Sequence, residues 1–167
     1  EEGVYGVNDF IDNGDGTVTD NATGLMWQQV DDGNTYDWAN ALAYAKNSEL
    51  AGYTDWRLPN TKELQSIVDY EKTTIPAIDE TYFTCTDSDS WFWTSTTQGD
   101  FKYTACYIAF GYAYSRENSS ATEYYDWHGS GAQRSDPKAG DPEDYLLESE
   151  NADDLLRIEN YVRLVRN

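Results

Sequence analysis

Histidine and cysteine are scarce in this chain of 167 residues, which contains one histidine and two cysteines. Zinc sites in proteins are built mainly from histidine and cysteine ligands. His128 alone cannot supply a site with several histidines, and Cys85 and Cys106 do not stand at C-x-x-C spacing. We therefore expect no multi-histidine or C-x-x-C zinc site within this chain.

Basic residues are also few, because 11 lysines and arginines face 31 aspartates and glutamates and give a formal net charge of -20. A strongly negative surface repels polyanions through the same electrostatics that draws basic proteins to them. We therefore expect neither nucleic acid, nor an anionic membrane, nor a heparin-like glycan among the partners.

Long apolar runs are missing too, and no stretch approaches the roughly 18 residues of a membrane span. The chain starts Glu1-Glu2-Gly3, without a methionine and without a signal segment. We interpret this start as that of an exported protein whose signal peptide has been removed, and we expect it outside the cell or at the cell surface, with no membrane insertion.

The two cysteines flank the stretch Trp91–Thr96. In an oxidising extracellular setting, Cys85 and Cys106 are expected to form a disulfide that stabilises the fold by about 3 kcal/mol. Two buried free thiols are the alternative interpretation.

Aromatic residues are plentiful, with 14 tyrosines, 6 tryptophans and 5 phenylalanines. These side chains bury large areas, and a chain of this length can build one core without metals or cross-links. We therefore predict a single domain over residues 1–167. We assign five of the tryptophans to its core: Trp27, Trp38, Trp56, Trp91 and Trp93.

Turn and capping residues predict the elements of the first half. Residues 13–16 read Asn-Gly-Asp-Gly, which supplies the positive φ of a tight hairpin turn, and residues 25–27 follow as a buried strand. Thr35 or Asp37 can begin a helix that runs to Leu50. Asn60 precedes Glu63 by three residues, which is the capping-box spacing of a second helix.

The second half predicts strands at 91–96 and 105–110, and a final strand at 161–165, from alternating side chains. Helices early in the chain and antiparallel strands later indicate an α+β fold. Between them, residues 111–156 form a long, polar and irregular region. A loop of that size in one domain is usually functional, and we expect it to be ordered.

Four separated stretches of sequence carry a family resemblance: GDGTVTDNATGLMWQ at 14–28, AGYTDWRLPNTKEL at 51–64, WFWTST at 91–96 and NYVRLVRN at 160–167. In this order they resemble the Legionella collagen-like protein C-terminal domain family, from about residue 10 to residue 167. The resemblance implies a C-type-lectin-like fold, with two helices packed on antiparallel sheets, long ordered loops, and N- and C-terminal strands side by side.

The resemblance also implies a secreted or surface module used in adhesion or ligand binding. The name-giving member is trimeric, so we expect a homo-oligomer. That member is associated with sulfated glycosaminoglycans, which the charge of this chain argues against.

Enzymatic activity is not expected. The formylglycine-generating enzyme shares the implied fold and uses a reactive cysteine pair near its C-terminal core, but no matching motif follows Cys106 in this chain. There is also no G-x-S-x-G elbow and no phosphate-cradling glycine loop. We therefore assign no catalytic residue.

The polar region holds the candidate ligand-binding residues. Exposed tyrosine and tryptophan rings suit stacking on a sugar or contact with a protein, and basic side chains in an acidic chain are candidates for polar ligand contacts. The predicted set is Tyr124, Tyr125, Trp127, His128, Arg134 and Lys138. Packing at the domain edge is the alternative for the aromatic rings, and a structural hydrogen bond is the alternative for His128.

Other basic residues fall inside the family stretches. We interpret Arg57, Arg163 and Arg166 as internal ion-pair partners, with Asp55 or Glu63 as candidate acids.

Calcium is the one cofactor that the composition favours, because it takes six to eight oxygen ligands. The candidate ligands are Asp136, Asp141, Glu143 and Asp144, in a segment stiffened by two prolines. A solvated acidic loop is the alternative. The acids of the first hairpin lack the EF-hand spacing, and we interpret them as part of a turn.

Together these features predict a non-enzymatic recognition or adhesion module, secreted or at the cell surface. It would bind a glycan or protein ligand through residues 111–145, with calcium as an aid. The alternative is a self-assembling structural subunit of an extracellular oligomer or filament, whose surface aromatics are subunit contacts.

Overall fold

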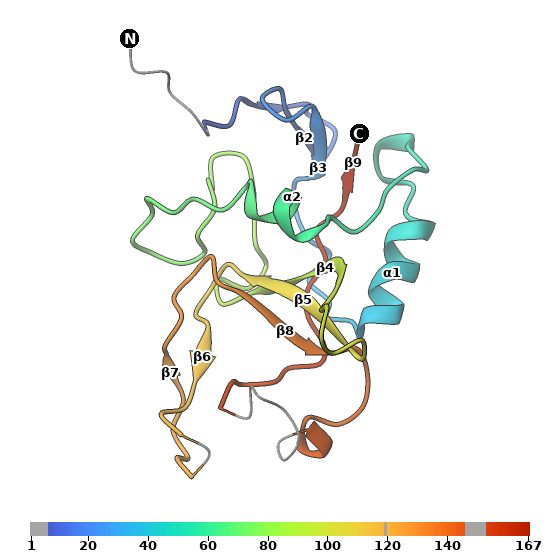
Figure 1. The fold of residues 1–167 in the computed structure, drawn as a ribbon. Helices are drawn as coiled ribbons and strands as arrows, with labels where there is room; N and C mark the ends of the chain where they lie inside the picture. Colours follow the sequence, from blue (N-terminus) through green and yellow to red (C-terminus); the bar gives the residue numbers. More distant parts are fainter. Residues whose placement is uncertain (1–6, 119, 146–152) are drawn as a thin grey trace.

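Three antiparallel sheets form the frame of the molecule (Figure 1). The structure is a computed structural model and describes residues 7–118, 120–145 and 153–167. The first sheet contains β1 (Phe10–Asp12), β2 (Thr17–Asp20), β3 (Leu25–Gln28) and β9 (Val165–Arg166), in that order. The second contains β4 (Trp91–Thr97), β5 (Thr104–Ala109) and β8 (Gln133–Pro137), and the third pairs β6 (Tyr114–Ser115) with β7 (Tyr125–Asp126).

Two short α-helices accompany the sheets, α1 (Trp38–Asn47) and α2 (Thr61–Gln65), together with the 3-10 turns η1 (Leu50–Gly52) and η2 (Pro142–Tyr145). The predicted α+β class with antiparallel sheets is confirmed. The predicted neighbourhood of the terminal strands is confirmed as well, because Met26 and Trp27 of β3 pair with Arg166 and Val165 of β9.

Local chemistry explains where the helices begin. The Asp37 carboxylate accepts a hydrogen bond from the Asn40 N–H at 2.8 Å, so Asp37 caps α1. At α2, the Asn60 side chain accepts from the Glu63 N–H at 2.9 Å, while Glu63 accepts from the Asn60 N–H at 2.8 Å. This is the predicted capping box. The first helix ends at Asn47, earlier than predicted, and η1 follows with Ala51 at a positive φ of 53°.

The core lies on both faces of the β4–β5–β8 sheet, and every residue of β5 is buried. Trp91, Trp93 and Tyr107 belong to the cluster on one face, and Phe92 and Ile108 to the cluster on the other. Because successive side chains of a strand point to opposite faces, this one sheet contributes to two core clusters. Four of the five tryptophans assigned to the core are buried, as predicted; Trp38 is half-buried and donates its indole N–H to the Thr94 carbonyl at 2.8 Å.

The polar region between residues 111 and 156 contains three strands that were not predicted, β6, β7 and β8, of which β8 is the longest. β8 pairs with β5 along its length, from Thr104 opposite Pro137 to Ile108 opposite Gln133. Its sequence, QRSDP, is polar and ends in proline, which is atypical of an inner strand. An edge strand tolerates such a sequence, because one side of its backbone needs no partner.

The C-terminal segment is extended but forms a shorter strand than predicted. Asn160 bridges Tyr36, Tyr161 bridges Phe92, and Val165 pairs both with Arg57 and with Trp27 of β3. The segment changes partner at nearly every step because it threads between the two larger sheets. No ladder is therefore long enough to make residues 161–165 one continuous strand.

The predicted disulfide between Cys85 and Cys106 is wrong, because both residues are free thiols. The Cys85 sulfur lies 3.4 Å from an Nη of Arg163, whereas the Cys106 sulfur accepts from the Gln133 amide at 3.9 Å. Each sulfur is thus held against a different part of the fold. The alternative interpretation, two free thiols, describes the structure.

Arg163 is fully buried, and its guanidinium gathers distant parts of the backbone. It donates to the carbonyls of Gln28, Gln29 and Thr84 at 2.8–3.0 Å, and the Asp31 carboxylate lies 3.6 Å away. The rings of Phe83 and Phe92 lie 5.4 and 4.9 Å from its central carbon. The prediction of internal ion pairs is confirmed here and at two further pairs, Arg57 with Glu63 and Arg166 with Asp55.

We expect Arg163→Met to lower the free energy of unfolding by about 3–5 kcal/mol, because it leaves buried carbonyls without their donor and the buried Asp31 carboxylate without its ion-pair partner. Urea unfolding followed by tryptophan fluorescence measures this change. The control is Arg166→Met, whose partner Asp55 is largely exposed, and it should cost less than about 1 kcal/mol. Equal losses in the two variants would contradict the central role of Arg163.

The free thiols give a second prediction. Burial raises the pKa of both cysteine thiols, so the native protein should react slowly with a thiol reagent at neutral pH. After denaturation without a reductant, both Cys85 and Cys106 should be alkylated, and mass spectrometry counts the added groups. Modification that requires prior reduction would show a disulfide instead.

Candidate functional site

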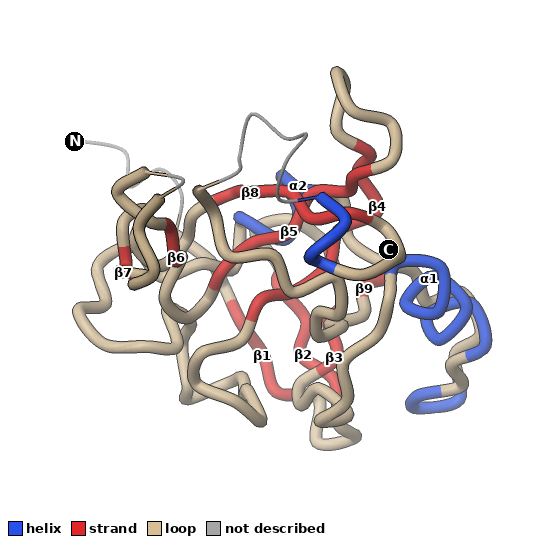
Figure 2. The backbone as a smooth tube through the Cα atoms, turned by 90° about the horizontal axis from the view of Figure 1, so that it is seen from below, coloured by secondary structure: helices blue, strands red, loops and turns tan. Residues whose placement is uncertain are grey.

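A pocket of about 230 Å³ opens beside the β6–β7 ribbon. The ribbon extends from the main body at the lower left of Figure 1 and reappears at one side of the molecule in Figure 2. The walls of the pocket include Ser115, Arg116, Trp127, His128, Arg134 and Asp154. They come from β6, from the turn after β7, from β8 and from the C-terminal segment.

Asp154 is the centre of the polar network in this pocket and is 4% exposed. Its carboxylate lies 3.0 Å from His128 Nε2 and accepts a hydrogen bond from Arg134 Nε at 2.8 Å, with a second bond from an Nη of Arg134. Because a carboxylate only accepts hydrogen bonds, the histidine nitrogen is the donor in its bond with Asp154. One buried carboxylate thus fixes the orientation of two side chains that line the pocket.

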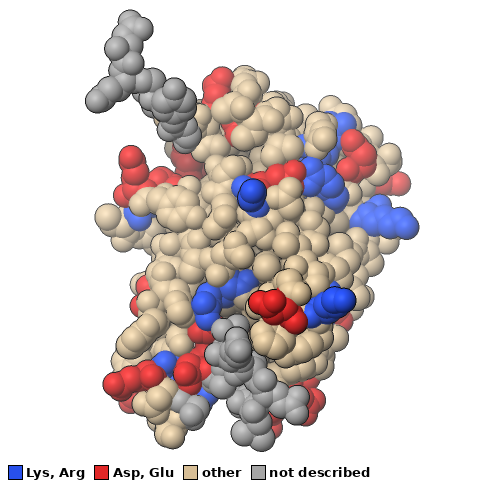
Figure 3. All heavy atoms as spheres, viewed as in Figure 1, with Lys and Arg blue, Asp and Glu red and all other residues tan. Residues whose placement is uncertain are grey.

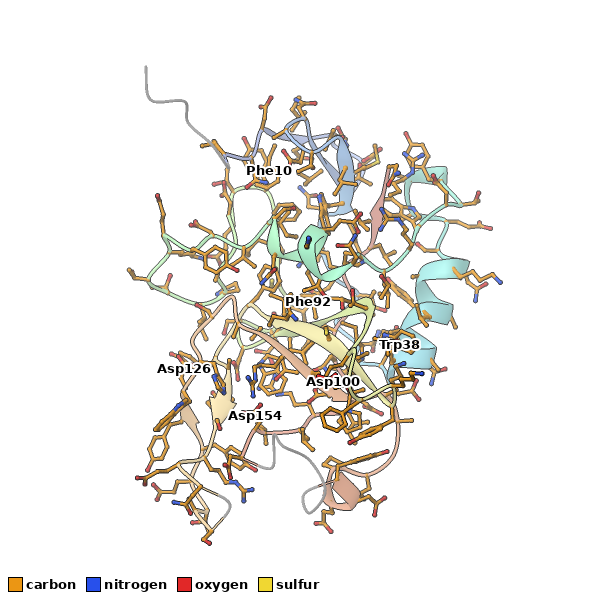
Figure 4. The ribbon with its side chains drawn as sticks, in the orientation of Figure 1. Phe10, Trp38, Phe92, Asp100, Asp126 and Asp154 are labelled. Atoms are coloured by element: carbon orange, nitrogen blue, oxygen red, sulfur yellow. The ribbon has the colours of Figure 1, made fainter. Side chains whose placement is uncertain are left out.

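Backbone pairing carries Asp154 to this place. Asp154 bridges Ser115 of β6, the Leu155 N–H donates to the Tyr114 carbonyl at 3.1 Å, and the Arg116 N–H donates to the Asp153 carbonyl at 2.7 Å. The C-terminal segment thereby lines the free side of β6. Figure 4 shows Asp154 and Asp126 on this lower part of the molecule, away from Phe10 and Phe92.

The turn after β7 presents aromatic rings to solvent. The Asp126 carboxylate accepts hydrogen bonds from the N–H groups of Ala113 and Gly129, at 2.9 and 3.1 Å. The turn is therefore fixed on both sides of Trp127. The Trp127 side chain is 61% exposed and Tyr125 is 52% exposed.

The six predicted ligand-binding residues separate into groups. Trp127, His128 and Arg134 line the pocket. Tyr124 lies beside it with its ring 5.4 Å from the Arg116 guanidinium carbon, and Tyr125 lies on β7. Lys138 is elsewhere: its ammonium group is 4.3 Å from the Trp38 ring centroid and donates to the Thr97 hydroxyl at 2.8 Å.

The four predicted calcium ligands are not brought together. Asp136 is fully buried and its carboxyl accepts from the Asn160 amide at 2.9 Å, whereas Asp141, Glu143 and Asp144 lie at η2 and are exposed. Within the described residues, no three side chains of histidine, cysteine, aspartate or glutamate are grouped to hold a metal ion. These four residues do not form one ligand set, and calcium binding stays a prediction.

Sequence analysis missed Asp154, Ser115 and Arg116. Asp154 lies in the polar region 111–156 but after its predicted ligand-binding part, residues 111–145. It reaches the pocket through strand pairing that no local pattern indicates. The one available signal was Arg134, a basic residue in an acidic region that needs a partner.

On the face shown in Figure 3, basic side chains lie among acidic ones and form no continuous patch.

Comparison with known proteins identifies the family. Residues 16–128, more than half of the chain, match the family described as the Lcl C-terminal domain. The chain therefore belongs to the Lcl C-terminal domain family. The matched region contains Trp127 and His128 but ends before Arg134 and Asp154, so the pocket is only partly inside it. No curated protein and no solved structure matches the chain.

None of the helices in the described ranges combines the length and the apolar character that crossing a bilayer requires.

Proposed function

We propose that this protein is a secreted or cell-surface recognition module with a C-type-lectin-like fold, without enzymatic activity, that binds a glycan at the pocket beside Trp127. The family is generally associated with the outside of the cell. The two helices, the antiparallel sheets and the neighbouring terminal strands are compatible with that fold.

The observation that carries the proposal is an exposed indole next to a polar pocket. Trp127 offers a flat apolar surface on which the C–H face of a sugar ring can stack. Arg134, His128 and Asp154 are already oriented by their mutual hydrogen bonds, so little side-chain entropy is lost when a ligand binds. A ring on Trp127 with its hydroxyls toward these groups is the arrangement we propose.

The balance of charge favours a neutral glycan over a polyanion. Arg116, Arg134 and His128 are accompanied in the same pocket by Glu117, Asp153 and Asp154. The basic groups therefore do not create a site of positive potential, and the net charge of -20 opposes an anionic ligand at longer range.

We expect Trp127→Ala to weaken glycan binding by roughly fivefold or more, since a lost aromatic contact is worth on the order of 1 kcal/mol or more. A glycan array followed by calorimetry on the best ligand measures the effect. Tyr103→Ala is the matched control, because Tyr103 is an exposed ring that does not line the pocket and precedes Thr104, the first residue of β5. An array without ligands, or binding that survives in Trp127→Ala, would refute this site.

A self-assembling structural subunit is the second candidate, and an open sheet edge favours it. Within the described residues, β1 has a hydrogen-bonded neighbour on one side only, and its Ile11 side chain is exposed. An unpaired edge can accept a strand from another copy.

If assembly uses this edge, Ile11→Lys should reduce the molar mass measured by light scattering and abolish rings or fibres in negative stain. A wild-type protein that stays monomeric over a wide concentration range would exclude the subunit.

A further inference from the structure

A carboxyl group and an amide lie together inside the core, far from water. Asp136 on β8 is 0% exposed and Asn160 in the C-terminal segment is 1% exposed. The Asn160 side-chain N–H donates to Asp136 Oδ2 at 2.9 Å. Both residues lie on the side of the sheet that holds Tyr107, since Asp136 is opposite Ala105 in the β5–β8 register.

One oxygen on each side chain is left without a partner. Asp136 Oδ1 and Asn160 Oδ1 are buried and accept no hydrogen bond from any described residue. The Arg157 N–H favours the ionised form of this carboxyl, yet Asp136 Oδ1 itself accepts no hydrogen bond from a described residue. Buried polar atoms without partners are rare and cost about 1–3 kcal/mol each, so two on one contacting pair require an explanation.

A proton on the Asp136 carboxyl would provide a partner for both oxygens. A carboxylic acid and a primary amide each present a donor and an acceptor side by side. A proton on Asp136 Oδ1 becomes the donor for Asn160 Oδ1, parallel to the existing bond from the Asn160 amide to Oδ2. The pair is then closed by two hydrogen bonds, and no charge is buried.

We infer that Asp136 and Asn160 form a neutral acid–amide pair that acts as a positioning element for the pocket, locking β8 to the C-terminal segment. Arg134 lies two residues before Asp136 on β8, and Asp154 lies six residues before Asn160. The pair thus fixes the two segments whose side chains meet in the Arg134–Asp154 ion pair. This consequence for the pocket rests on the recognition role proposed above; the pair itself does not.

The charged groups around Asp136 affect the ionisation of its carboxyl in opposite directions. Arg157 from the C-terminal segment favours the ionised carboxyl and Asp154 opposes it. The Arg157 guanidinium is engaged elsewhere, 3.0 Å from an Asp89 carboxylate oxygen and 3.8 Å from the Trp91 ring. Tyr107 on β5 is buried and its pKa is raised, mainly by burial and then by Asp136; Arg134 partly opposes this rise. Burial dominates at Asp136 and raises its pKa from 3.8 to about 7.

The direction of the pH effect follows from these values. Between about pH 4 and 7 the folded protein keeps a proton that the unfolded chain has released, so the fold loses stability as the pH rises through that range. The stability that the protonated pair contributes is fully present below the pKa of Asp136 in the unfolded chain. It is lost as the pH rises above the pKa of Asp136 in the folded protein. The unfolding equilibrium constant should rise by up to about tenfold per pH unit from this group alone.

Asp136→Asn tests the pair, because a second amide offers a donor at the same position at every pH. We expect urea unfolding to show that the variant matches or exceeds wild-type stability at pH 8. The stability of the variant relative to wild type should increase from pH 5 to 7, because only in the wild type does unfolding release this proton in that range. Asp100→Asn, in the exposed turn between β4 and β5 (Figure 4), should instead follow wild type at each pH.

If Asp136→Asn is less stable than wild type at all pH values, or parallel to it, Asp136 is an ordinary ionised acceptor and the inference is wrong.

Carbon-13 NMR of the wild-type protein gives an answer that does not depend on the variant folding. The Asp136 carboxyl signal should titrate with a midpoint near 7; a midpoint below 4 would refute the neutral pair. The Arg134 Nε–H signal should shift with the same midpoint in wild type and stay constant in Asp136→Asn. A titrating carboxyl with an unchanged Arg134 signal would refute the positioning role. No glycan is used, so these results are independent of the recognition proposal.

Discussion

The guanidinium of Arg163 connects three parts of the chain from inside the core. It reaches the end of β3, the segment at Thr84 and, through Asp31, the loop after β3. A planar group with donors in fixed directions can satisfy several carbonyls at once, which the single ammonium group of a lysine does less well. The same residue belongs to the segment that threads between the larger sheets. This buried cation therefore adds to the backbone pairing that places them, in which Val165 pairs with β3 and Tyr161 with β4.

Features with local causes were predictable from the sequence. The capping box at Asn60 and the hairpin at residues 13–16 need only neighbouring residues, and both are present. Trp91 and Trp93 are buried because strand alternation places two large apolar rings on the same face. The predicted disulfide failed for the opposite reason: it was argued from the cellular compartment, whereas bonding depends on where Cys85 and Cys106 lie in space.

Features that depend on distant pairing could not be predicted. β8 is a strand because β5 offers it a complete edge, not because QRSDP favours extended structure. Part of the candidate site was predicted in Trp127, His128 and Arg134, since aromatic and basic residues are visible in sequence. Its central residue, Asp154, was not, because β6 brings it to the pocket by backbone bonds. The acids proposed for calcium were close in sequence, yet only Asp136 lies on β8 and is buried, whereas Asp141, Glu143 and Asp144 follow at η2 and are exposed.

The pairing of β9 with β3 has a geometric consequence for display. β1 and β9 share the sheet at the top of Figure 1, while the β6–β7 ribbon and its pocket lie at the lower end. A linker or partner domain joined through either of these strands would meet the body at the end away from the pocket. Attachment to a surface through that sheet would leave the β6–β7 ribbon at the far end of the molecule, so attachment and ligand binding would use different ends.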